Sequence, residues 1–271
     1  MTYFHIIERS LLRLSGEEAL GFLHDILTAS VADLPVGEMQ QSCLLSPQGR
    51  ILFDMFIYHI DENEVLVEVD TEQADELRKK LMLYRLRRPI TIAREDEMAV
   101  VAWFDDTPHL QDKTAFKDKR HKDMGHRAIM PLAEIGALPL GDRDEYHWRR
   151  ITLALPEGAQ DLTPNRALML EAGLDELKAV DFQKGCYIGQ EVTARTRYRG
   201  LVKKRLTPVR AKQLATGEAI TLDGKDVGII HSTAKAGDEV IGLVLLKLSA
   251  KKAAEEDKAQ LMAGAHPASL L

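Results

Sequence analysis

Residues 42–60, SCLLSPQGRILFDMFIYHI, restrict the fold more than any other stretch of this chain. Two apolar runs lie on either side of Pro47-Gln48-Gly49, a tripeptide with the composition of a tight turn. The pattern predicts a strand, a turn and a second strand, so the two strands are expected to pair antiparallel.

Helical and extended patterns alternate around this strand pair. Ser15 and Glu18 form a capping box, S-x-x-E, in front of apolar residues at helical spacing, and a helix is expected to end near Thr28. Asp70 is expected to begin a second helix, which Pro89 ends. Further strands are expected over 64–69, 89–93 and 98–104. The first hundred residues therefore predict the α+β class with a mainly antiparallel sheet.

The remainder of the chain divides by composition. Residues 105–147 are polar and rich in turn residues, whereas 166–180 are expected to be partly helical. After Gly200, short strands broken by glycine, with a hairpin at Asp223-Gly224, predict a small β-barrel module. We therefore divide the chain into an N-terminal α+β part at 1–104, a second α+β part at 105–200, a C-terminal β-barrel at 201–250 and a frayed or helical tail at 251–271.

Charge and composition disfavour several classes of protein. The net charge of −6 argues against a dedicated nucleic-acid binder. No segment has the roughly 18–20 apolar residues needed to cross a bilayer, so no membrane partner is expected. The N-terminus lacks a signal-peptide pattern and the two cysteines are far apart, which predicts a cytoplasmic protein. The chain shows no long exposed heptad or apolar stripe, and we expect a monomer.

No metal site is expected from the sequence. His109, His121 and His126 have a spacing that fits no zinc template, and the chain has no CxxC pair. Cys43, at the start of a predicted strand, is expected to be an ordinary core residue.

The second cysteine lies in an unusual setting, KGCYIGQEVTARTRYRG, at residues 184–200. Gly185 and Gly189 on either side of Cys186 permit a tight backbone that a ligand can approach closely. Lys184 would favour the thiolate of an exposed Cys186. A cationic block follows, suited to phosphate, carboxylate or polyglutamate: Arg195, Arg197, Arg199, Lys203, Lys204 and Arg205. The residues by themselves equally allow a glycine turn, a buried cysteine and a solvated basic strand.

The stretch KGCYIGQEVTAR resembles the signature of the YgfZ family of folate-binding iron–sulfur cluster assembly proteins, which are relatives of the glycine-cleavage T-protein, an aminomethyltransferase. The segments LSGEEALGFLHDILTASVADLP, CLLSPQGRILFDMFIY and LEAGLDELKAVDFQKGC resemble the same family. The resemblance covers roughly residues 5–248 and is weakest between 105 and 150. It implies a T-protein-like folate-binding fold in three parts, with tetrahydrofolate in a central pocket.

The resemblance also implies site residues. Glu171, in MLEAG, corresponds to the glutamate that binds the pterin in T-proteins, where a carboxylate accepts two N–H groups together; a helix-surface glutamate is the alternative. The other candidates for binding the cofactor are Lys184, Gly185, Tyr187, Gln190, Glu191, Arg195 and Arg197.

Two residues are candidates for chemistry. T-proteins carry two adjacent aspartates where this chain has Phe53-Asp54, so Asp54 is the candidate catalytic carboxylate, with a hydrogen-bonded structural aspartate as the alternative. A shift of one residue in the strand register would turn Asp54 to the other face of the sheet. Cys186 is the candidate reactive thiol, for ligation, exchange or redox protection near iron–sulfur clusters.

The resemblance thus predicts a tetrahydrofolate-binding accessory protein for assembly or repair of iron–sulfur clusters, whose partners are assembly proteins or client enzymes. The alternative is a tetrahydrofolate-dependent aminomethyltransferase that uses Asp54. A nucleic-acid binder acting through residues 195–205 is a third reading, and the acidic net charge makes it the weakest.

Overall fold

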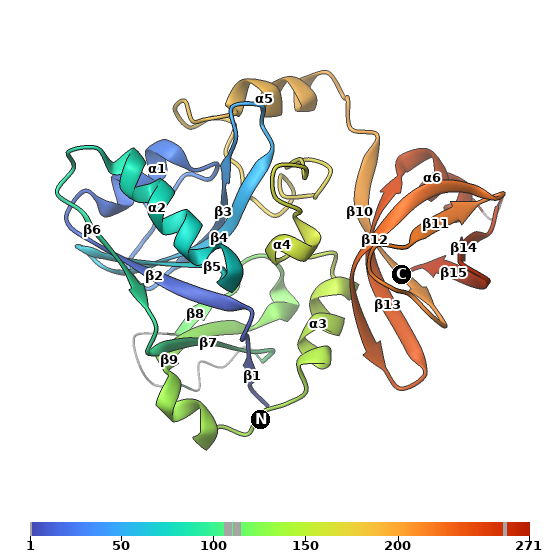
Figure 1. The fold of residues 1–271 in the computed structure, drawn as a ribbon, viewed down its shortest axis with the longest axis horizontal. Coiled ribbons are helices and arrows are strands. Elements are labelled where there is room, and N and C mark those ends of the chain that lie inside the picture. The colour runs from blue at the N-terminus through green and yellow to red at the C-terminus, as the bar shows by residue number, and fades with distance from the viewer. Residues whose placement is uncertain (1, 106–109, 111–114, 257–258) are drawn as a thin grey trace.

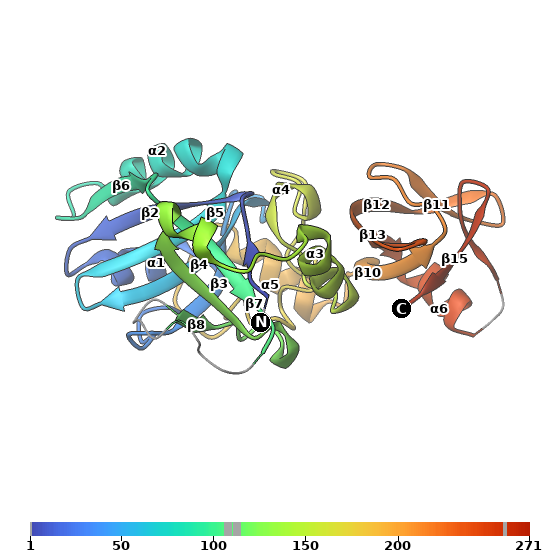
Figure 2. The ribbon, with the colours of Figure 1, turned by 90° about the horizontal axis from the view of Figure 1, so that it is seen from below.

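The computed structural model describes residues 2–105, 110, 115–256 and 259–271 (Figure 1). The chain forms a two-sheet body and a C-terminal barrel, which lie at opposite ends of the longest axis in both views (Figures 1 and 2). One strand, β10 (Lys204–Ala211), leads from the body into the barrel.

A five-stranded antiparallel sheet forms the first layer of the body. Its order is β3-β4-β5-β2-β6, and the strands are β2 (Arg9–Ser15), β3 (Met39–Leu45), β4 (Ile51–Asp61), β5 (Glu64–Asp70) and β6 (Thr91–Glu95). Helices α1 (Ala19–Ile26) and α2 (Ala74–Arg85) pack on one face, against Phe53, Met55 and Ile57 among others. The expected strand pair is β3 and β4, so the antiparallel α+β prediction is confirmed.

A four-stranded sheet covers the other face. Its order is β1-β7-β9-β8, with β1 (Phe4–His5), β7 (Met98–Trp103), β8 (Ala115–Lys117) and β9 (His126–Pro131). Phe56 and Tyr58 of the first sheet share a core with Val100 and Ile129 of the second. The boundary drawn at residue 104 therefore passes through one sheet, because strand pairing between β7 and β9 joins the two sides.

Short helices and turns complete the body. They are η1 (Thr71–Gln73), η2 (Lys122–Met124), η3 (Leu132–Ala137), α3 (Arg143–Thr152), α4 (Gly158–Asp161) and α5 (Gln190–Tyr198). Residues 166–180 form successive turns instead of the partly helical segment that we expected.

The C-terminal module is a closed barrel of six strands in the order β10-β13-β12-β11-β14-β15. Its other strands are β11 (Ala219–Leu222), β12 (Lys225–Ala236), β13 (Glu239–Lys247), β14 (Leu261–Ala263) and β15 (His266–Leu270). Asp223 and Gly224, both at positive φ, make the expected hairpin between β11 and β12.

The predicted tail at 251–271 is wrong in part. Helix α6 (Leu248–Glu255) begins it, but β14 and β15 then close the barrel, and β15 pairs with β10. These strands have three and five residues, too short for a clear period-two pattern. The pairing of β14 with β11 and of β15 with β10 is a tertiary effect that local sequence does not record.

Candidate functional site

Asp54 faces the interior of the body. Alternation along β4 turns Phe53 toward α1 and α2 and turns Asp54 toward the second sheet. Its Oδ2 accepts from Arg9 Nη1 at 3.1 Å and from the Gly158 N–H at 3.2 Å. Burial raises the pKa of the carboxyl, although Arg9 opposes this. Among the described residues Oδ1 has no hydrogen-bond partner.

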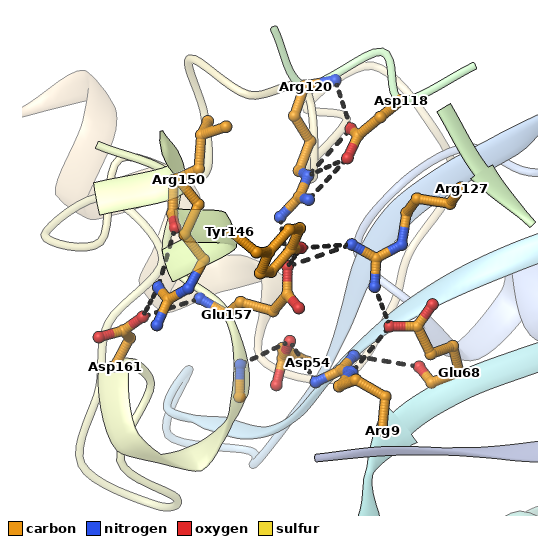
Figure 3. A network of polar contacts seen from close by, with 12 residues as sticks. Arg9, Asp54, Glu68, Asp118, Arg120, Arg127, Tyr146, Arg150, Glu157 and Asp161 are labelled. Carbon is orange, nitrogen blue, oxygen red and sulfur yellow. Dashed lines mark hydrogen bonds and ion pairs between the residues drawn. The ribbon is translucent and has the colours of Figure 1, made fainter. Parts of the chain in front are cut away.

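Asp54 is one end of a buried network of ion pairs between the two sheets (Figure 3). Glu68 on β5 accepts from Arg9 and from Arg127, while Glu157 accepts from Arg120 at 2.8 Å and from Arg127 at 3.4 Å. Further members are Tyr58, Asp118, Tyr146, Arg150 and Asp161.

The arginines of this network also pack on one aromatic ring. The guanidinium carbons of Arg120 and Arg127 lie 4.5 Å from the centre of the Phe56 ring, and that of Arg9 lies 5.5 Å away. Burial raises the pKa of Glu157, but Arg127 and Arg120 overcome this and hold it well below its usual value. Removing one partner from such a set leaves an uncompensated buried charge. The arrangement locks Asp54 into structural contacts, and its catalytic role stays a prediction.

We did not predict this network from the sequence, although one feature could have indicated it. Glu68 and Arg127 lie next to apolar residues inside the strands EVLVEVD and HRAIMP, and a charged residue in such a position needs a buried partner. The sequence cannot show which partner, because Glu68 and Arg127 are 59 residues apart.

The motif loop is held by Lys184. Its ammonium donates to the backbone carbonyls of His24, Leu27 at 2.7 Å and Ala29 at 3.1 Å, at the C-terminal end of α1. A cation there is favoured by the helix dipole. Burial lowers the pKa of Lys184 to about 8. Its ammonium therefore uses its N–H groups to hold these carbonyls, and its predicted effect on Cys186 stays a prediction.

Cys186 is exposed, in contrast to Cys43, which is fully buried as expected. The residue after it, Tyr187, is buried in the core, and its ring lies 5.4 Å from the Lys184 ammonium. Lys184 and Tyr187 thus hold the loop in place on either side of Cys186, whose thiol is exposed. The alternative of a buried cysteine in this motif is wrong.

Gly189 ties the motif to the turn between β3 and β4. It has φ 83°, and a Cβ at this position would lie 2.6 Å from the Ser46 carbonyl oxygen. Only glycine permits this contact. Gln190 and Glu191 then begin α5, which therefore starts directly on the turn that sequence analysis singled out.

α5 presents the basic residues of the motif. Arg195 and Arg197 lie in it and are exposed, and the Arg197 guanidinium stacks 4.0 Å from the Phe182 ring. Large apolar side chains accompany them: Val192, Tyr198 and Leu201 are all exposed. This surface, residues 192–204 together with Cys186, is called the α5 surface below.

Glu171 lies elsewhere, in a groove of about 330 Å³ between the turns at 160–172 and the barrel. Leu206, Ile229 and Leu245 give the groove apolar walls, and Arg166 and His231 contribute polar groups. His231 Nδ1 lies 3.0 Å from the Gln160 carbonyl oxygen, so Nδ1 donates to this carbonyl. Within the described part of the chain, Nε2 is buried without a partner.

The residues predicted for one site therefore occupy three places. Asp54 lies in the buried network, Glu171 lines the groove, and Lys184, Gly185, Cys186, Tyr187, Gln190, Glu191, Arg195 and Arg197 belong to the motif loop and α5. Asp54 and the motif residues are absent from the lining of the groove.

The described residues contain no cluster of three or more His, Cys, Asp or Glu side chains able to hold a metal. His121 Nδ1 accepts from the Asp123 N–H, and His126 Nδ1 lies 3.2 Å from the Asp105 carbonyl oxygen. His109 lies outside the described residues. No helix in the described ranges is long and apolar enough to cross a membrane.

Comparison with known proteins identifies relatives of this chain. The GCVT N-terminal domain family matches residues 6–102. The mitochondrial iron–sulfur cluster assembly factor IBA57 of Homo sapiens is 34% identical, over 90% of this chain and 76% of its own length. The same factor of Mus musculus is 32% identical, over 91% of this chain and 77% of its own length.

The fold matches a solved structure, the glycine cleavage system aminomethyltransferase T of Bartonella henselae. The TM-score is 0.77 with 16% identity, over 100% of this chain and 84% of that chain. This confirms the T-protein-like fold.

The prediction of a cytoplasmic protein is wrong, because the IBA57 relatives of Homo sapiens and Mus musculus are both mitochondrial proteins and point to that location instead.

Proposed function

This chain belongs to the family of the iron–sulfur cluster assembly factor IBA57, and from that premise we propose that it takes part in the assembly of iron–sulfur clusters together with other assembly proteins. Within that role, Cys186 is the residue that meets the cluster. The exposed thiol on a loop anchored by Lys184 and Tyr187 is the observation that carries this assignment.

A single thiol limits what the site can do. The thiolate is the form that ligates iron, and a cluster takes about four protein ligands, so Cys186 supplies one and a partner protein supplies the others. The proton of the thiol goes to solvent when iron binds, and the cluster is cargo that passes between the two proteins.

The α5 surface suits the partner in this exchange. Exposed cations surround exposed Tyr198 and Leu201, a combination that favours an acidic protein surface with an apolar centre. Cys186 precedes α5 by four residues, and we propose that a partner docked on α5 brings its cluster ligands to this thiol.

Replacing Cys186 by serine tests the assignment. In cells that depend on this protein, Cys186→Ser is expected to lower the activity of iron–sulfur enzymes while the thermal midpoint of the purified protein stays unchanged, because the side chain is exposed. Cys43→Ser is the matched control, which should act through stability alone. Full activity of the iron–sulfur enzymes with Cys186→Ser would remove the thiol from the mechanism.

We also propose that the groove at Glu171 binds tetrahydrofolate. Its volume, apolar walls and partly buried carboxylate suit a pterin ring whose N–H edge needs an acceptor. Aminomethyl transfer, the alternative activity, has less support, since Asp54 is committed to Arg9 and does not line this groove.

Anaerobic calorimetry with tetrahydrofolate tests the groove. Micromolar binding is expected for the wild type, with a loss of at least tenfold in Glu171→Ala. Glu62→Ala, an exposed change on the β4–β5 turn, should bind as the wild type does. Absence of binding in the wild type would remove folate from the function and leave the role of Cys186 untouched.

A further inference from the structure

The C-terminal end of α2 exposes large apolar side chains. Leu83 is 70% exposed, Leu86 is 80% exposed and Met82 is 44% exposed. Met82 and Leu83 lie in the last turn of α2, and Leu86 follows the helix as its C-cap, so all three belong to one short segment. The opposite face of α2 is buried through Leu77 and Leu81, so amphipathic packing already accounts for the helix without these three residues.

The same segment is strongly basic in an acidic protein. Residues 78–88, RKKLMLYRLRR, contain six cations and no acid, whereas the chain has a net charge of −6. Arg88 pairs with Asp25 at 2.6 Å, and Arg78 lies 3.9 Å from Asp75. Among the described residues, Lys79 and Arg87 make no ion pair within 4.0 Å. We call residues 78–88 the α2 tip.

The backbone at Leu86 gives a second, independent indication. Leu86 has φ 55° and ψ −113°, a conformation that glycine adopts readily and that costs other residues on the order of 1–3 kcal/mol. Glycine is also the usual residue just after a helix. A leucine here therefore strains the chain, while its side chain stays 80% exposed and gains little from burial within the monomer.

The position of the α2 tip suits a flat surface. The link from α2 to β6 lies at the end of the molecule opposite the barrel in both ribbon views (Figures 1 and 2). A stable protein interface buries about 800 Å² on each partner, which is far more than three side chains supply. A bilayer surface needs only that apolar tips enter the headgroup region while cations meet the phosphates.

We propose that the α2 tip binds the surface of an anionic lipid bilayer, with Leu83 and Leu86 inserted among the headgroups and Lys79, Lys80 and Arg87 against lipid phosphates. Each basic residue near such a surface contributes about 1 kcal/mol. The binding is therefore weak, reversible and sensitive to salt, and it differs from the spanning segment that the sequence excludes. It places the protein at a membrane with the α5 surface free for its partner.

Co-sedimentation of the full-length protein with vesicles tests the proposal. The probe is a vesicle of phosphatidylcholine with phosphatidylglycerol, and the control vesicle is phosphatidylcholine alone. We expect binding to the anionic vesicle only, and loss of that binding at high salt because screening weakens the charge contacts. Equal sedimentation with both vesicles, or none with either, overturns the proposal; an acidic protein partner would give the second result.

Leu86→Gly separates binding from folding. It removes both the inserted side chain and the backbone strain, so vesicle affinity should fall about tenfold, the effect of roughly 1.4 kcal/mol of apolar transfer, while the thermal midpoint stays level or rises. Leu83→Ser should weaken binding similarly. Leu140→Ser, an exposed leucine away from the tip, is the matched control. Wild-type affinity in both tip variants overturns the proposal.

Discussion

At the scale of single residues, Lys184 shows how position decides chemistry. In the sequence it neighbours Cys186 and suggests thiol activation. In the structure its ammonium meets three backbone carbonyls at the end of α1, so the three N–H donors are all used. Lys184 is a positioning residue for the loop that carries Cys186.

Lys184→Met is expected to make residues 182–188 more mobile. Three carbonyls would lose their donor, which costs about 1–3 kcal/mol in local stability when they stay partly buried. Native-state hydrogen exchange should therefore become faster in this loop than in the sheets. Lys203→Met, an exposed change in the same basic block, should exchange like the wild type. Unchanged exchange in Lys184→Met would show that Tyr187 alone holds the loop.

Asp54 carries a pH dependence of defined sign. Burial raises its pKa in the folded state, so the folded chain binds more protons than the unfolded chain just above the ordinary aspartate pKa. The stability contributed by protonated Asp54 is complete below that ordinary pKa and is lost as pH rises through the folded pKa. Denaturant titrations of Asp54→Asn should lack this loss, because the amide does not titrate.

If the free energy of unfolding of Asp54→Asn varied with pH as that of the wild type does, the Arg9 contact would outweigh burial in setting the pKa of Asp54. Arg9→Lys is a useful companion, because it keeps the charge and removes the forked geometry that reaches both Asp54 and Glu68.

At the scale of elements, the barrel depends on its last two strands. Leu261, Ala263 and Ala268 are buried in the barrel core, and β15 joins β14 to β10. Closure removes the sheet edges that would otherwise stay unpaired.

Ending the chain after Glu256 is expected to open the barrel. Unpaired edges of β10 and β11 and exposed core residues should lower the thermal midpoint by several degrees and promote association, measured by calorimetry and light scattering. A chain lacking only Leu271, whose side chain is partly exposed, is the control. A truncated protein that melts like the wild type would mean that four strands suffice.

At the scale of the whole molecule, the buried ion network joins three parts of the body. Arg9, Asp54 and Glu68 come from the first sheet, Arg127 from the second, and Glu157 from the segment before α4. The contacts between layers are thus charged at their centre, where most domains are apolar.

Glu157→Gln is expected to cost about 3–5 kcal/mol at pH 7, since Arg120 and Arg127 lose their shared carboxylate. The depressed pKa of Glu157 means that its contribution is present above the ordinary glutamate pKa and is lost as pH falls through the folded value. The free energy of unfolding of the variant should therefore be lower at pH 7 and should fall less steeply as the pH is lowered. Glu62→Gln, on an exposed turn, should match the wild type in urea titrations.

The sequence by itself determined the local elements and the reactive motif. Apolar runs on either side of Pro47-Gln48-Gly49 predicted β3 and β4, apolar residues at helical spacing predicted α1, and the Asp223-Gly224 pair predicted the barrel hairpin. The capping box expected at Ser15 and Glu18 does not form, because α1 has Glu18 as its N-cap residue without a side-chain hydrogen bond. Each of these predictions depends on residues close together in the chain, where propensity and spacing act directly.

Only the tertiary structure decided how these elements combine. It paired Glu68 with Arg127, gave Lys184 its carbonyls 155 to 160 residues away, placed Glu171 in a groove apart from Asp54, and closed the barrel with β15. Such contacts depend on which distant segments meet, and the free energy that selects them comes from burial and ion pairing across the whole molecule. No local pattern of residues carries that information.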